Sequence, residues 1–216
     1  MTDFDLERAM ARADLCRFIA ACYYQPGPEF AEERVFESMA GAASRLDPDL
    51  AAAARRLGEA FAAEGHEALL VEYTRLFLGP VDPVARPYGS VWLEPGGGLM
   101  QDSTRAVEAL YHQCDFEVAE DVHDLPDHIA VELEFLYLLL FRENEARLKN
   151  DAAAMQATLK LRERFLHGHL GGWVAPFTDA VRAGTQSAFY RELAGLTERF
   201  VMMEAARNPS LQGDRP

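Results

Sequence analysis

Residues 121–141 read DVHDLPDHIAVELEFLYLLLF, so a cluster of acids and two histidines runs directly into a strongly apolar segment. The apolar residues of this segment fall on every side of a helix, which is typical of a helix buried in a protein core. The sequence therefore predicts a central core helix over residues 125–149. Its polar head needs an explanation, because isolated buried carboxylates are costly.

Helical apolar stripes recur on both sides of the central segment. They cover residues 15–22, 36–46, 50–61, 69–77, 100–114, 155–166 and 189–200. Asp47-Pro48 is typical of a helix start, and no alternating strand pattern of useful length is present. The sequence predicts an all-α fold, a helical bundle of about eight to ten helices. It forms a single domain over residues 1–208, followed by a frayed tail at 209–216.

Residues 79–98, GPVDPVARPYGSVWLEPGGG, interrupt the helical pattern with four prolines and five glycines. This composition predicts a long hinge-like loop, and long loops inside compact domains are often functional. The segment carries side chains suited to binding, among them Tyr88 and Trp92. It could also serve as a linker between two helical halves, and both roles stay open.

The net charge is −14, from 35 acidic and 21 basic residues. This balance argues against nucleic-acid binding, which needs a cationic surface. It is compatible with a cationic peptide partner, and equally with solubility alone. The start, MTDFDLERAM, has no signal-peptide pattern, and no apolar run reaches the length of a membrane span. We expect a cytoplasmic protein without stable membrane insertion.

Other features bear on chemistry at a site. The three cysteines show no CxxC spacing and are expected to be reduced, mostly buried thiols. His128 and Glu132 are four residues apart, but the chain lacks the two Glu-x-x-His motifs on separate helices that a dinuclear metal site requires. No nucleophile motif or phosphate-binding loop is present either. An acid–base role for Asp127 stays open, although nothing supplies a substrate pocket for it.

Helix capping explains part of the polar head. Pro126 suits a first helical turn, and Asp124 or Asp127 could accept from free backbone N–H groups, a contribution of about 1 kcal/mol. Capping leaves the other polar residues unexplained. At about 100° per residue, Asp127 shares a face with Glu134, and His128 shares another with Glu132. Two polar stripes on a buried helix indicate a cleft wall or a buried polar network.

The order of motifs along the chain resembles the TorD/DmsD family of cytoplasmic molybdoenzyme maturation chaperones. The motifs are EYTRLFLGP (72–80), PYGSVWL (87–93), LMQDST (99–104), LPDHIAVELEFLYLL (125–139), HLGGWVAPF (169–177) and FYRELAGLTERF (189–200). They keep a consistent order over residues 10–203. The match is closest in PDHIAVELEF, which is similar to the family signature PDH-x-x-x-E-L-E-F.

The resemblance implies an all-helical protein that is not an enzyme and carries no metal or other cofactor. Such chaperones bind the twin-arginine signal peptide and the apo form of a molybdopterin oxidoreductase catalytic subunit. They assist cofactor insertion and delay export until the subunit is mature. Asp127 and His128 match signature positions implicated in leader binding, Glu132 and Glu134 extend that signature, and Tyr88, Ser90 and Trp92 match the loop motif. Gly89 departs from the family, which usually has Glu there, and one expected carboxylate is therefore missing.

A twin-arginine leader presents two guanidiniums followed by an apolar segment, so its receptor needs carboxylates beside an apolar groove. We expect Asp127 and Glu134 to provide the carboxylates, next to Tyr88, Trp92 and Phe135. One alternative is a NarJ-like assembly chaperone for a cytoplasm-facing molybdoenzyme. Another is a nucleotide-binding or nucleotide-hydrolysing enzyme, because GTP binding has been proposed for some relatives. The sequence leaves open the client, and whether the chaperone is a monomer or a domain-swapped dimer.

Overall fold

The computed structural model describes residues 3–27, 30, 33–79, 82–117 and 124–207. Within these ranges the chain forms helices and no β-strand, which confirms the predicted all-α bundle of eight to ten helices. The elements are α1 (Asp3–Ala21), α3 (Val35–Ser44), α4 (Pro48–Glu64), α5 (His66–Tyr73), the π-helical turn η1 (Thr74–Leu78), α6 (Gly89–Leu93), α7 (Asp102–His112), α8 (Ile129–Leu148), α9 (Ala152–Gly168), α10 (Leu170–Gly184) and α11 (Ala188–Ala206). The tail predicted at 209–216 lies outside the described residues.

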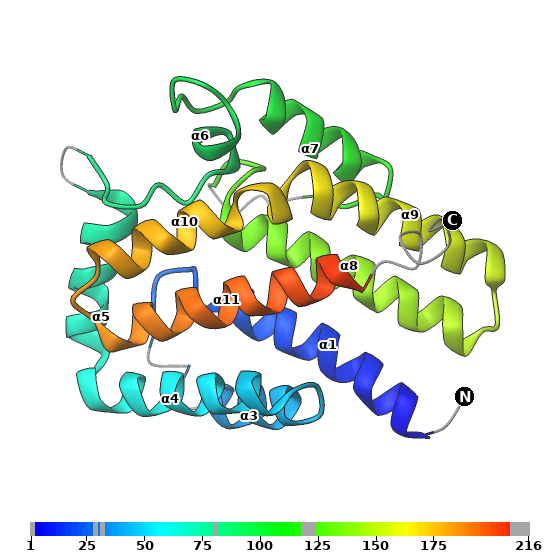
Figure 1. The fold of residues 1–216 in the computed structure, drawn as a ribbon, viewed down its shortest axis with the longest axis horizontal. Coiled ribbons are helices and arrows are strands. Elements are labelled where there is room, and N and C mark those ends of the chain that lie inside the picture. The colour runs from blue at the N-terminus through cyan, green and yellow to red at the C-terminus, as the bar shows by residue number, and fades with distance from the viewer. Residues whose placement is uncertain (1–2, 28–29, 31–32, 80–81, 118–123, 208–216) are drawn as a thin grey trace, which may run out of the picture.

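Helices from both sides of the 79–98 segment share one core. α1 packs along α8, and α4 packs against α11, which also contacts α10. In Figure 1, α10 and α11 run side by side, α3 and α4 lie along one edge, and α6 and α7 lie along the opposite edge. Among the described residues, none of the helices is long and apolar enough to cross a membrane.

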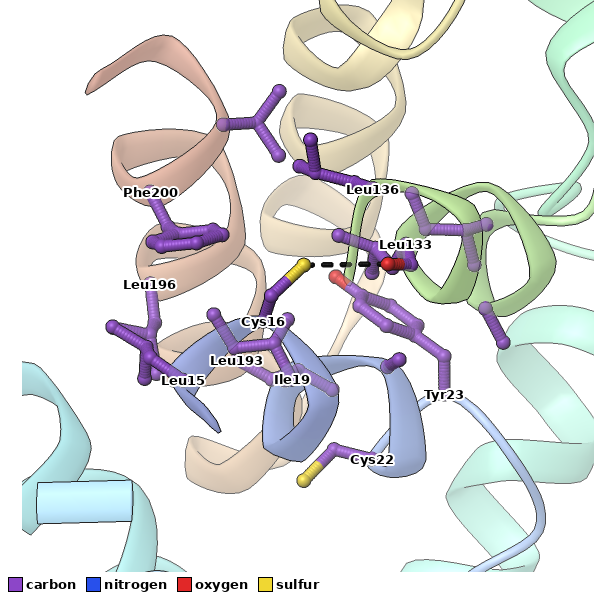
Figure 2. Close-up of a cluster of buried hydrophobic side chains, with 14 of the residues drawn as sticks. Leu15, Cys16, Ile19, Cys22, Tyr23, Leu133, Leu136, Leu193, Leu196 and Phe200 are labelled. Carbon is purple, nitrogen blue, oxygen red and sulfur yellow. Dashed lines mark hydrogen bonds between the residues drawn. The ribbon is translucent and has the colours of Figure 1, made fainter. Parts of the chain in front are cut away.

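One cluster of buried side chains lies where α1 meets α8 and α11 (Figure 2). Its buried side chains include Leu15, Ile19, Leu133, Leu136, Leu193, Leu196 and Phe200. The Cys16 thiol lies among them and donates to the Leu133 carbonyl at 3.3 Å. Cys16, Cys22 and Cys114 are all buried and free, as predicted. Burial raises the pKa of the Cys22 thiol to about 12, so it is unreactive at neutral pH.

Four buried ionic side chains join α1, α8, α9 and α11; we call Arg12, Glu143, Arg162 and Glu204 the buried quartet. The Arg12 guanidinium donates to both Glu204 carboxylate oxygens, at 2.9 and 2.6 Å, and to Glu143 at 3.2 Å. Arg162 donates to Glu143 at 2.5 Å. No member exposes more than 7% of its side chain. The quartet therefore fixes α1 on α8, because each charge would be left without compensation if the helices separated.

Two local predictions about helix starts had different outcomes. α4 begins as predicted: Asp47 Oδ1 accepts from the N–H groups of Asp49 and Leu50, at 2.9 and 3.1 Å, and Pro48 is the first helical residue. The central helix begins at Ile129, later than predicted. The predicted Asp124, Pro126 and Asp127 caps are wrong. The N-cap is His128, whose Nδ1 accepts from the Ala130 N–H at 3.2 Å.

The late start of α8 follows from pairing with the segment that precedes α6. Tyr88 and His128 form an isolated antiparallel bridge. The Gly89 N–H donates to the Asp127 carbonyl, and the Ile129 N–H donates to the Pro87 carbonyl, each at 2.8 Å. This pairing holds His128 extended, directly after a turn at residues 126–127. The predicted 79–98 loop is interrupted by the short helix α6 directly after the bridge.

Candidate functional site

Aromatic rings gather where the end of α1 meets the Tyr88–His128 bridge. The His128 imidazole is nearly parallel to the Tyr24 ring, with centroids 6.3 Å apart, and the Tyr88 ring meets it edge-on at 5.3 Å. His128 is only 2% exposed, whereas both tyrosines are partly exposed. The buried imidazole therefore contacts two tyrosine rings that are partly exposed to solvent.

Each tyrosine hydroxyl is bonded to a carboxylate. Tyr24 donates to Glu134 Oε1 at 3.0 Å, and Tyr88 donates to Asp124 Oδ1 at 3.3 Å. Both acids are partly exposed, and neither forms an ion pair with a lysine or arginine in the described part of the chain. We call these five residues, Tyr24, Tyr88, Asp124, His128 and Glu134, the mouth. Within the described ranges neither carboxylate has a lysine or arginine partner, which favours binding of a cation.

Protonation states in the mouth follow from burial. Burial, and then the Asp124 carboxylate, raise the pKa of Tyr88 to about 12. Burial and the Glu134 carboxylate also raise the pKa of Tyr24, so both hydroxyls remain donors at neutral pH. Burial lowers the pKa of His128 to about 4, against the opposing effect of Asp124 and Asp127. The imidazole is therefore neutral at pH 7, and the mouth holds no positive charge of its own.

Three predicted site residues lie beneath the mouth, where solvent does not reach. Ser90 and Glu132 are 0% exposed and Asp127 is 1% exposed. Asp127 Oδ2 accepts from the Ser90 N–H at 2.8 Å, in the first turn of α6. Glu132 Oε2 accepts from the Trp173 indole at 3.0 Å. Burial raises the pKa of Glu132 well above its ordinary value. These side chains hold α6 and α10 against α8.

The predicted residues therefore divide into groups. Tyr88, His128 and Glu134 belong to the mouth, and His128 is its buried member. Trp92 lies apart from them: its indole donates to the Arg86 carbonyl at 2.9 Å, and its ring contacts Phe177. Phe135, expected beside the site, is fully buried in the core. Sequence reasoning missed Tyr24, for which the only signal was an aromatic pair before Pro26, and considered Asp124 only as a cap.

Gly89 is required by the close approach of α6 to α10. A Cβ atom at this position would lie 2.9 Å from the Trp173 indole nitrogen and 3.2 Å from Glu132 Oε1. At position 89 the family resemblance implies Glu, but in this chain the Trp173 indole occupies the space that a larger side chain would need. A carboxylate could enter here only if the indole moved.

Gly89→Ala is expected to lower the free energy of unfolding by about 1–3 kcal/mol, because the added methyl group overpacks a buried contact. Urea denaturation measures this loss. Gly195→Ala is the matched control, since a Cβ there meets nothing within 4 Å. In mid-helix it should leave stability unchanged or raise it by about 0.5–1 kcal/mol. Equal stability of the two variants would contradict the tight contact.

In the described ranges, no group of three or more His, Cys, Asp or Glu side chains is arranged to hold a metal ion. The mouth instead offers two carboxylates next to aromatic faces. Carboxylates accept forked hydrogen bonds from a guanidinium, and aromatic rings attract a cation placed over them. The arrangement therefore fits an organic cation better than an inorganic one.

Comparison with known proteins places this chain in a family. The family model described as "Nitrate reductase delta subunit" matches residues 43–179. "Chaperone protein TorD" of Vibrio parahaemolyticus is 28% identical over 138 residues, which cover 64% of this chain and 63% of that protein. The Shewanella loihica protein of the same name is 29% identical over 186 residues, covering 81% and 78% of the two chains.

Two further matches are more distant or more partial. "Selenate reductase assembly chaperone protein" of Thauera selenatis is 31% identical over 111 residues, about half of each chain (51% and 52%). A crystal structure from Archaeoglobus fulgidus, described as a redox enzyme maturation protein, has the same fold. Its TM-score is 0.54 at 20% identity, covering 88% of this chain and 93% of that one.

The match to the Vibrio protein spans less than two thirds of that protein's length. The family model, by contrast, covers well over half of this chain. The protein therefore belongs to the nitrate reductase delta subunit family, which includes the TorD chaperones, and the resemblance seen in its sequence motifs is confirmed.

Proposed function

We propose that this protein is a cytoplasmic maturation chaperone for the catalytic subunit of a molybdoenzyme, and that its mouth binds the arginines of that subunit's leader peptide. The observation that carries the proposal is the pair of carboxylates, Asp124 and Glu134, which have no cationic partner among the described residues. Both lie next to a tyrosine ring. A guanidinium satisfies both features, since it forks onto a carboxylate and stacks on an aromatic face.

The relatives support the chaperone part of this proposal. They are described as TorD chaperones and as an assembly chaperone for selenate reductase. Bound to the leader, this chain would keep the apo-subunit from export until its molybdopterin cofactor has been inserted. No step of this role requires a bond to be made or broken by the chaperone, so the proposal assigns it no catalytic residue.

The family description favours a second type of client. The description of the family names nitrate reductase as the enzyme concerned. The alternative is therefore a NarJ-like role with a cytoplasm-facing molybdoenzyme. The two roles differ in the peptide recognised. A client that is exported presents two adjacent arginines before an apolar segment, whereas a cytoplasm-facing client need not present both.

The proposal is tested by calorimetric titration of a synthetic leader that has two adjacent arginines followed by an apolar segment. We expect binding that weakens with added salt, because exposed charges are screened. Glu134→Gln should weaken binding about tenfold or more, since a hydrogen bond to a charged group contributes about 1.5–3 kcal/mol.

Two controls separate recognition from general charge. Glu59→Gln removes one exposed acid from α4 and should leave affinity unchanged. A leader with both arginines replaced by glutamine should bind at least tenfold more weakly. Binding of the glutamine leader as tight as that of the arginine leader would favour the alternative client, and no binding of either leader would overturn the proposal.

A further inference from the structure

One face of α8 continues from the mouth as an exposed apolar surface. After Glu134, the residues Tyr137, Phe141 and Leu148 follow at helical spacings of three, four and seven, which places all of them on one side of the helix. Phe141 is 45% exposed and Leu148 is 56% exposed. The Tyr137 and Phe141 rings are 6.3 Å apart and form a continuous apolar surface. Between Phe141 and Leu148 the same face carries Glu145, whose carboxylate pairs with Lys149. We call Tyr137, Phe141 and Leu148 the α8 strip.

Much of the rest of α8 is covered by other helices. α1 and α9 pack along it, and α10 contacts it as well. The intervening positions Leu136, Leu139, Leu140 and Glu143 are buried. The exposure of Phe141 and Leu148 is therefore confined to one face, and that face begins at an acid of the mouth. Large apolar side chains aligned on an exposed surface often mark an interaction site.

Charge is distributed unevenly along this face. At the mouth end, Asp124 and Glu134 have no cationic partner in the described segments. At the other end, Arg147 pairs with Glu143 and the exposed Lys149 pairs with Glu145. A peptide with cationic residues at one end and apolar residues at the other fits this face better with its cations at the mouth, because the acids at the opposite end are already paired with Arg147 and Lys149.

We propose that the apolar segment that follows the leader's arginines binds along the α8 strip, with the peptide running from the mouth toward Leu148. This inference rests on the proposed function and extends it from the arginines to the rest of the leader. Fourteen residues of α8 separate Glu134 from Leu148 and span about 21 Å at about 1.5 Å per residue. An extended peptide of roughly six or seven residues covers that length.

The test uses two synthetic probes: the full leader, and a short peptide that ends directly after the two arginines. We expect the double variant Phe141→Gln, Leu148→Gln to weaken the full leader about tenfold and to leave the short peptide unchanged. Partial burial of two apolar side chains accounts for a loss of this size. Met202→Gln is the matched control, since Met202 on α11 is 47% exposed, close to the value for Phe141.

The outcomes separate this inference from the one on which it rests. If the wild type binds both probes and the double variant binds the full leader as tightly as the wild type does, the strip is not the binding surface. If the wild type binds neither probe, the mouth proposal fails and this inference fails with it. Sedimentation velocity tests whether the strip binds a second copy of the chain instead. If the wild type is a dimer, and the double variant is a monomer that binds the leader as tightly as the wild type does, the strip is a dimer interface and the inference is overturned.

Discussion

Glu204→Ala is expected to lower the free energy of unfolding by about 3–5 kcal/mol, the usual cost of leaving a buried charge without its partner. Glu204 is 1% exposed and accepts both of the short bonds from Arg12. Its removal leaves Arg12 with Glu143 alone, at 3.2 Å, on a carboxylate that already accepts from Arg162 and Arg147. Chemical denaturation at neutral pH measures the loss.

Arg199→Ala is the control on the same helix. Arg199 pairs with Asp49 at 2.9 Å, but both side chains are more than half exposed. Exposed pairs of this kind contribute about 0–1 kcal/mol. A Glu204→Ala loss of less than 1 kcal/mol would show that the quartet does not hold the helices together. A large loss should also weaken leader binding, because the quartet holds α1 on α8 and the mouth contains residues from both sides of that contact.

Wild-type stability is expected to fall by about 3 kcal/mol, relative to the His128→Asn variant, as the pH falls from about 6.5 to about 4. Burial lowers the folded-state pKa of His128 to about 4 from an ordinary 6.5. The stability that the neutral imidazole contributes is therefore present above pH 6.5 and is lost as the pH falls toward 4. A difference of one pH unit between the folded-state and unfolded-state pKa corresponds to about 1.4 kcal/mol of unfolding free energy.

Asparagine is the appropriate replacement because it can still cap α8. Its side-chain oxygen can accept from the Ala130 N–H as His128 Nδ1 does now, and it does not titrate. Acidic groups that do not interact with His128 titrate alike in both proteins and cancel in the difference between the two unfolding free energies. The difference therefore reports His128 together with its interactions with Asp124 and Asp127. A difference that stays constant between pH 7 and pH 4 would contradict the buried neutral imidazole. Denaturation curves collected at several pH values provide the measurement.

Helical periodicity was sufficient to predict most of the fold. The stripes around Leu15, Met39 and Phe200 identify faces that are indeed buried, because one buried face is a local property of the sequence. Asp47-Pro48 likewise marks a start that depends on only a few neighbouring residues. Where the structure depends on local hydrogen bonds and a single apolar face, the sequence is informative.

The start of α8 and the helix α6 could not be predicted in the same way. Both depend on the pairing of Tyr88 with His128, two segments forty residues apart. Asp127 was interpreted as a cap for its own helix, yet its carboxylate accepts from the Ser90 N–H. A carboxylate near two free N–H groups satisfies whichever the fold brings closer, and local sequence does not reveal that choice.

The candidate site shows the same limit more clearly. The sequence draws attention to the acidic and aromatic residues of the signature as a group, but it does not show which of them solvent reaches. Glu132 and Glu134 are two residues apart, and the first is fully buried while the second is partly exposed. Tyr24 joins the mouth through Glu134, which follows it by 110 residues. A partner so distant in sequence leaves no spacing pattern to detect.

The same long separation sets the order in which the mouth can form during synthesis. Tyr24 and Glu134 are 110 residues apart, and at translation rates of about 5–20 residues per second that distance takes about 5–20 s. During this interval Tyr88, Asp124 and His128 are added one after another, and the Glu134 carboxylate is the last part of the mouth to be synthesised. A ribosome-bound chain that ends before α8 therefore has no complete mouth with which to hold a client.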